Sequence, residues 1–185
     1  MIIVSELLFF LPIKTILLGA LLGLVVLAYF LTIHFIKWES VFHKELMIAV
    51  VYCTGLIITP LSSEASSMHW ENIFMLSPMF LLVMANLLLF AQKDISFDEA
   101  SNFPSASQSI GYKTTAKIIQ VIWLLFLTNL SFLLLYENIG ITIIYSLMFM
   151  MLFMISKFDR YPFVELHFRH IGDGVFLIPA LYFLL

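Results

Sequence analysis

Long hydrophobic runs, separated by short polar stretches, make up most of this sequence. A run of about 20 apolar residues is long enough to cross the hydrocarbon core of a bilayer as a helix. The pattern therefore predicts transmembrane helices, of which the second and the last are short and are expected to extend into their flanking residues. We expect six such helices, over residues 15–36, 46–61, 73–92, 118–136, 139–156 and 171–185.

Composition strengthens this prediction. Of the 185 residues, 62% are hydrophobic and only 11% are charged, whereas roughly a quarter of the residues in a soluble domain are charged. A water-soluble fold of this length could not bury so much apolar surface, but a bilayer accepts it. We expect one all-α domain over residues 1–185, a polytopic bundle of about six transmembrane helices. The one cysteine, Cys53, lies in an apolar run and is expected to pack there.

The basic residues predict how the bundle is oriented. Eight of the nine Lys and Arg residues fall in alternate loops, and the ninth, Lys14, precedes the first span. Loops rich in Lys and Arg stay on the cytoplasmic side of a membrane. We therefore expect an inner or cytoplasmic membrane protein whose main charged loops, 93–117 and 157–170, lie in the cytoplasm. The net charge of −3 gives no sign of a nucleic-acid partner.

Candidate chemistry gathers in these charged loops. Asp94 and Asp98 are four residues apart, so they share one face if the third helix continues through them. Mg²⁺ is commonly held by one or two carboxylates together with substrate phosphates. Lys113, Lys117 and Arg160 offer cations for phosphate oxygens. Carboxylates for a metal beside cations for phosphate form the pattern that diphosphate binding requires. The alternative is that these charges only mark the boundary between bilayer and water.

The segment from Asn86 to Gly111, NLLLFAQKDISFDEASNFPSASQSIG, resembles the second aspartate-rich motif of the UbiA superfamily of intramembrane prenyltransferases. Asp94 and Asp98 match the two aspartates of its DxxxD, Ser105 matches its hydroxyl residue, and Gly111 matches its closing glycine. The tail from 169 to 173, RHIGD, followed by an apolar segment that contains a proline, is also similar to the end of that family. The resemblance covers roughly residues 45–185, but its specific part is about 25 residues long.

The resemblance implies a site and an activity. In that family Asp94 and Asp98 would hold Mg²⁺ on the diphosphate of an isoprenyl donor. Lys113, Lys117 and Arg160 would neutralise the leaving diphosphate. The prenyl chain would lie among the Phe- and Met-rich helices and be transferred to an acceptor in the membrane. The partners implied are thus an isoprenyl diphosphate or another lipid, and the membrane itself.

The sequence also departs from that family. Phe90 and Ala91 stand where an Asn-Asp pair usually precedes the DxxxD, and nothing between Met1 and Lys44 supplies the first aspartate-rich motif, NxxxDxxxD. Half of a two-site metal clamp is missing. The alternative function is therefore a catalytically degenerate membrane protein that binds a lipid or quinone or supports a complex. A small transporter ranks last, because no ionisable residue lies near the centre of a span.

Further polar residues carry structural expectations. Asn86 and Asn129 lie well inside spans, and we expect them to form hydrogen bonds across helices. Asp173 is expected either to pair with Arg169, one helical turn earlier, or to interact with a helix N-terminus, rather than to act in catalysis. Several aromatic residues are candidates for lining a dry cavity, although packing is the expected role of each. They are Phe80, Phe90, Trp123 and Phe126.

Overall fold

The computed structural model describes residues 12–36, 43–62, 70–95, 105–135, 139–157 and 162–183. Helices account for nearly all of these residues, and none of them lies in a strand, so the all-α prediction is confirmed. The elements are α2 (Ile13–Ile36), α3 (His43–Ser62), α4 (Trp70–Lys93), α6 (Ala106–Ile110), α7 (Tyr112–Leu135), α8 (Ile139–Lys157), α9 (Pro162–Gly174) and the 3-10 helix η1 (Val175–Phe183).

Four of the described helices, α2, α4, α7 and α8, are long and apolar enough to cross a membrane. The sequence predicts six spans; α3 and the α9–η1 segment are not among these four. Large apolar side chains cover much of the outer surface of the bundle, as a bilayer solvent requires. The chain is therefore an integral membrane helical bundle.

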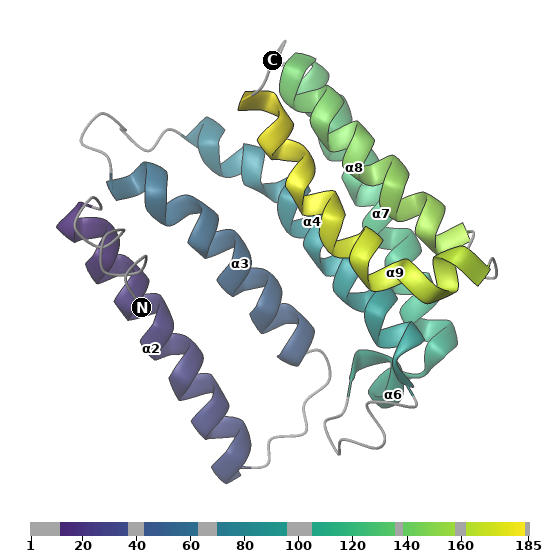
Figure 1. Cartoon of the computed structure of the whole chain (residues 1–185), viewed down its shortest axis with the longest axis horizontal. Coiled ribbons are helices and arrows are strands. Elements are labelled where there is room, and N and C mark those ends of the chain that lie inside the picture. The colour runs from purple at the N-terminus through teal and green to yellow at the C-terminus, as the bar shows by residue number, and fades with distance from the viewer. Residues whose placement is uncertain are drawn as a thin grey trace.

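Helix α4 forms the centre of the bundle. It packs against α3, α7 and α8, and more than half of its apolar stretch (56%) is buried, compared with none of the corresponding stretch of α2. Leu82, Ala85 and Leu88, at spacings of three residues along α4, have no exposed surface. In Figure 1, α3 lies between α4 and α2, which forms the outer edge of the molecule.

Side chains of α7 and α8 complete the core around α4. The ring of Phe126 is fully buried and stacks on Phe149 with ring centroids 5.1 Å apart, and Trp123 meets Phe149 edge-on at 5.2 Å. Packing is thus the observed role of Trp123 and Phe126. The Ser77 hydroxyl donates a hydrogen bond to Oδ1 of Asn129 (2.5 Å), which joins α4 to α7 as expected for Asn129.

The C-terminal segment begins earlier than the sequence predicts. Helix α9 starts at Pro162 rather than near residue 171, which suits proline because the first helical position needs no backbone N–H. It ends at Gly174, and η1, which contains Pro179, continues to Phe183. Gly172 lies so close to α4 that it has almost no room for a side chain. A Cβ atom there would lie 2.6 Å from Oδ1 of Asn86 and 2.8 Å from the ring of Phe90.

Most of the described basic residues lie at one end of the bundle, where α3, α7 and α9 begin and α4 and α8 end. We call it the charged end; the short helix α6 also lies there (Figure 1). Lys14, in the first turn of α2, lies at the opposite end. The basic residues at the charged end are Lys44, Lys93, Lys113, Lys117, Lys157 and Arg169.

Candidate functional site

A cavity of about 290 Å³ opens at the charged end, where α3, α4 and α9 meet. It combines a charged rim with an apolar wall, and we call it the charged cleft. Charged and apolar side chains from three separate stretches of sequence therefore meet in one place. The cleft is lined by Lys44, Glu45, Ile48, Leu87, Phe90, Ala91, Asp94, Arg169 and Asp173.

Asp94 and Arg169 form an ion pair at the rim of the cleft. Nη2 of Arg169 lies 2.5 Å from Oδ2 of Asp94. The backbone N–H of Asp94 donates to the carbonyl of Phe90 (2.9 Å), so the last turn of α4 fixes the position of the aspartate. The sequence predicts a pair between Arg169 and Asp173, on one helix. The ion pair that the structure shows instead joins α9 to α4, because α9 packs across the end of α4.

We expect this ion pair to contribute little to stability. The Arg169 side chain is 53% exposed, and exposed pairs usually contribute up to about 1 kcal/mol because water screens them. A double-mutant cycle with Asp94→Asn and Arg169→Gln, read from thermal unfolding in lipid nanodiscs, should give a coupling energy of at most about 1 kcal/mol. A coupling of several kcal/mol would instead identify the pair as a structural clamp.

Glu45 is the most deeply buried charged residue of the cleft. Its side chain is only 3% exposed, and its Oε1 accepts a hydrogen bond from the backbone N–H of Ala106, 2.9 Å away. Ala106 is the first residue of α6. The first backbone N–H groups of a helix have no partner within that helix. Glu45 therefore attaches α6 to α3 across 61 residues of sequence.

Gln108 attaches the same short helix to α4. Its Oε1 accepts from the backbone N–H of Ser105 (3.1 Å), and its Nε2 donates to the carbonyl of Ile95 (3.2 Å), just after the end of α4. A second link follows at the start of α7, where Nε2 of Gln92 donates to the carbonyl of Tyr112 (3.1 Å). The polar contacts of the 105–112 segment thus fix it to α3 and α4, two of the three helices that line the cleft.

Among the site residues predicted from sequence, Asp94 lines the cleft. Lys113 and Lys117 are exposed on the first turns of α7 and do not line it. Asp98 and Arg160 lie outside the described residues. Ser105 is buried and is the N-cap residue of α6.

Sequence reasoning did not assign four charged residues to the cleft: Lys44, Glu45, Arg169 and Asp173. Two of them show what the sequence could indicate. Lys44 lies in the first turn of α3, and Asp173 lies near the end of α9. Because each lies at a helix end beside a predicted charged loop, the sequence indicates where each lies along the membrane normal. It does not indicate which helix ends pack together.

A metal could find carboxylate ligands in the cleft. No group of three or more His, Cys, Asp or Glu side chains with metal-binding geometry occurs within the described residues. Asp94 and Asp173 line the same cavity, however, and Mg²⁺ commonly takes one or two protein carboxylates and completes its shell with water and substrate phosphates. The donor set therefore fits Mg²⁺ that arrives with a phosphorylated ligand.

Comparisons with known proteins add no relative to this picture. No protein-family model matches the chain, and no curated protein or solved structure matches it significantly. The interpretation of the charged cleft therefore depends on its own chemistry and on the resemblance carried by residues 86–111.

Proposed function

We propose that this membrane protein binds an isoprenyl diphosphate at the charged cleft. We further propose that it is a UbiA-like prenyltransferase homologue, which transfers the isoprenyl chain to an acceptor in the membrane. The observation that carries the proposal is the convergence of Lys44, Arg169, Asp94 and Asp173 on one cavity at the end of an apolar bundle. This site suits an amphiphile with a charged head.

The cations of the cleft suit the head of such a ligand. A diphosphate carries several negative charges, and Lys and Arg form strong charge-assisted hydrogen bonds to phosphate oxygens. The planar guanidinium of Arg169 can bind two oxygens at once, whereas Lys44 acts as a point charge. Because the Arg169 side chain is about half exposed (53%), a diphosphate can reach the guanidinium and compete with Asp94 for it.

The carboxylates would serve a metal bound with the ligand. Asp94 and Asp173 would hold Mg²⁺, together with Asp98 if the resemblance holds. The metal would neutralise charge on the leaving diphosphate. Asp94 is placed for this task by the last turn of α4, whose backbone hydrogen bond fixes it at the rim.

The inner wall of the cleft suits the reacting carbon atom of the donor. Leu87, Phe90 and Ile48 form an apolar part of the cavity wall. A carbon that develops positive charge as the diphosphate leaves is stabilised by an aromatic face and protected where water is excluded. The Phe90 ring is held in place by edge-on contact with Phe168, at a centroid distance of 5.6 Å.

Lipid binding without transfer is the second candidate. The structure offers one observation in its favour, since Asp94 already has a cationic partner in Arg169 and so needs no metal. In this case the cleft would hold the phosphate head of a lipid, and no diphosphate would be released. Lys113 and Lys117 would then have no part in binding, which agrees with their positions outside the cleft.

We also propose that the charged end faces the cytoplasm. The described basic residues concentrate at this end, and cytoplasmic loops carry the excess of Lys and Arg in membrane proteins. A cytoplasmic cleft would take its ligand from the cytoplasmic leaflet.

The proposal predicts Mg²⁺-dependent binding that depends on Lys44. The chain would be purified in nanodiscs of neutral lipid and titrated with a radiolabelled isoprenyl diphosphate, with Mg²⁺ or with a chelator. We expect Lys44→Ala to weaken binding about tenfold, since it removes one charge-assisted contact to phosphate. Lys14→Ala is the matched control at the opposite end and should bind as the unchanged protein does.

The outcomes separate the candidates. Absence of isoprenyl diphosphate binding with and without Mg²⁺ would contradict the transferase function. Equal affinities of Lys44→Ala and Lys14→Ala would remove the charged cleft as the site. Appearance of the radiolabelled isoprenyl chain on an acceptor from a membrane extract, together with released diphosphate, would establish transfer. Binding without either product would leave lipid binding as the function.

A further inference from the structure

The charged end has two parts that differ in the sign of their charge. The helices around the charged cleft carry both signs, since Lys44 and Arg169 lie beside three acidic residues. Helices α7 and α8, in contrast, contain lysines and no acidic residue. Within the described residues, their part of the charged end is therefore purely basic. Its lysines are Lys113, Lys117 and Lys157.

Lys157 lies at the contact between α7 and α8, which we call the seam. Phe149, Phe153 and Lys157 follow one another at intervals of four residues, so they share one face of α8. Phe149 stacks on Phe126 of α7 and also on Phe153, which identifies this face as the one beside α7. Nζ of Lys157 lies 5.5 Å from the centre of the Phe153 ring, a cation–π distance. This contact holds the ammonium group at the seam.

Lys117 lies at about the same height in the membrane as Lys157. Helix α7 begins and α8 ends at the charged end, and Phe149 contacts both Trp123 and Phe126. Lys117 precedes those two α7 residues by about two helical turns, and Lys157 follows Phe149 by about two turns. Lys113 lies one turn farther toward the aqueous phase. The three lysines therefore occupy the same end of the seam.

The surface below these lysines suits the acyl chains of a lipid. Leu124 lies two turns deeper than Lys117 on the same face of α7, and Met150 lies two turns deeper than Lys157 on α8. These apolar side chains are 65% and 54% exposed, as expected where a bundle contacts hydrocarbon. A phospholipid lying along the seam would meet cations at its head and apolar side chains along its tails.

The positive charge of this surface is not balanced by the described part of the protein. No ion pair of Lys113, Lys117 or Lys157 is found among the described residues. The first turn of α7 contains no acidic residue, and the dipole of a helix places partial positive charge at its N-terminus. The dipole and the lysines both favour an anion from outside the chain.

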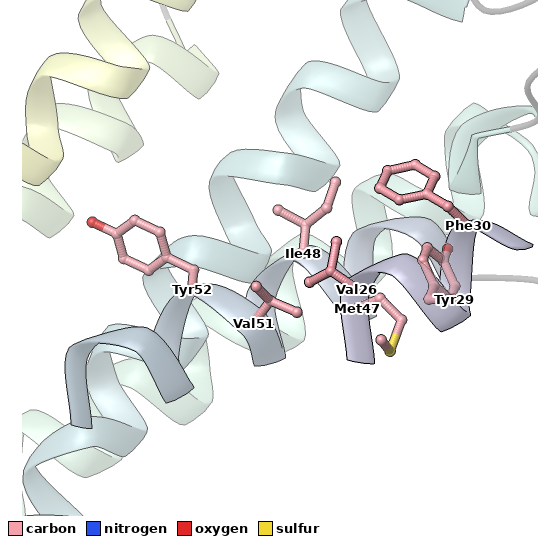
Figure 2. A pocket seen from close by; sticks show the side chains of 7 residues that line it. All are labelled: Val26, Tyr29, Phe30, Met47, Ile48, Val51 and Tyr52. Atoms are coloured by element: carbon pink, nitrogen blue, oxygen red, sulfur yellow. The ribbon is translucent and has the colours of Figure 1, made fainter. Parts of the chain in front are cut away.

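The apolar groove between α2 and α3 offers no such charge. Its volume is about 290 Å³, and side chains from both helices line it (Figure 2). None of the seven side chains that line it is charged at neutral pH. The groove can accept hydrocarbon, but it has no cation for an anionic head. The seam between α7 and α8 provides both kinds of contact.

We propose that the charged end of the seam binds an anionic phospholipid. Its headgroup lies among Lys113, Lys117 and Lys157, and its acyl chains lie along Leu124 and Met150. Clusters of basic residues between membrane helices are recurrent sites for anionic headgroups. The inference is independent of the proposed function, because none of these residues lines the charged cleft.

Native mass spectrometry of the purified full chain, titrated with phosphatidylglycerol or phosphatidylcholine, tests the inference. We expect phosphatidylglycerol to bind more tightly. Each lysine near a membrane surface contributes about a fivefold factor, so Lys117→Gln/Lys157→Gln should weaken phosphatidylglycerol binding roughly tenfold to thirtyfold and change phosphatidylcholine binding little. Lys117→Arg/Lys157→Arg keeps both charges and should bind as the unchanged protein does.

Lys14→Gln/Lys93→Gln is the matched control, because it removes two lysines that lie on neither α7 nor α8. It should leave phosphatidylglycerol binding unchanged. Equal losses in the two glutamine variants would mean that binding follows net charge, and the site would be wrong. It would also be wrong if Lys117→Gln/Lys157→Gln bound normally while Lys44→Gln did not, since the lipid would then occupy the cleft. Excess glycerol phosphate should not displace the lipid; displacement would identify a site for free phosphate instead.

Discussion

Gly172→Ala should destabilise the bundle by about 1–3 kcal/mol, the usual cost of adding a methyl group to a packed site. A Cβ atom at this position would lie 2.6 Å from Oδ1 of Asn86 and 2.8 Å from the Phe90 ring. Neither neighbour can easily move, because Asn86 is only 4% exposed and Phe90 packs against Phe168. The loss should appear as a lower midpoint of thermal unfolding in nanodiscs.

Gly174→Ala provides the control on the same helix. No heavy atom lies within 4 Å of a Cβ built at Gly174. Alanine is favoured over glycine in a helix by about 1 kcal/mol, so this change should be neutral or stabilising. Only Gly172→Ala should therefore lower the midpoint. Equal shifts would mean that α9 does not pack against α4 at Gly172.

Glu45→Leu should release α6 from α3. The leucine removes the carboxylate oxygen that accepts from the backbone N–H of Ala106, and hydrogen bonds to charged groups contribute about 1.5–3 kcal/mol. A loss of this free energy corresponds to roughly a tenfold to hundredfold change in an equilibrium constant. We therefore expect amide hydrogen exchange at Ala106 to accelerate by that factor. The measurement is exchange monitored by mass spectrometry over the peptide that contains residues 105–112.

Glu45→Gln distinguishes the hydrogen bond from the charge. Glutamine keeps a carbonyl oxygen that can accept from Ala106 and has nearly the same shape, so exchange should stay close to that of the unchanged protein. If the glutamine and leucine variants exchange equally fast, the negative charge rather than the hydrogen bond holds α6. If neither variant changes the exchange rate, the contact with Ala106 does not hold the segment.

Much of the fold could be predicted from hydropathy. A bilayer-spanning helix must satisfy its backbone hydrogen bonds within itself and present apolar side chains to lipid, so its position along the chain is visible as an apolar run. Helices α2, α4, α7 and α8 correspond to such runs. Helix α9 was harder to predict, because Arg169, His170 and Asp173 interrupt the apolar pattern before the helix reaches its 3-10 continuation.

The candidate site was predicted only in part. Asp94 could be identified from its place at the end of an apolar run and from the DxxxD pattern, and it does line the cleft. Its partner Arg169 is 75 residues away, and no local rule connects the two. Spacing within a helix suggested Asp173 as the ion-pair partner of Arg169. In the structure, α9 packs across the end of α4 and Arg169 lies next to Asp94. Which helix ends converge is a property of packing, and a single sequence does not display it.

The contact between Glu45 and Ala106 also orders the assembly of the protein during its synthesis. The carboxylate emerges from the ribosome 61 residues before the amide that it binds. At roughly 5–20 residues per second, it waits about 3–12 s for its partner. In that interval α4 is synthesised, so the Glu45 carboxylate stays without this hydrogen bond until the central helix has been made. The bond then joins α3, from the early part of the chain, to α6, from the later part.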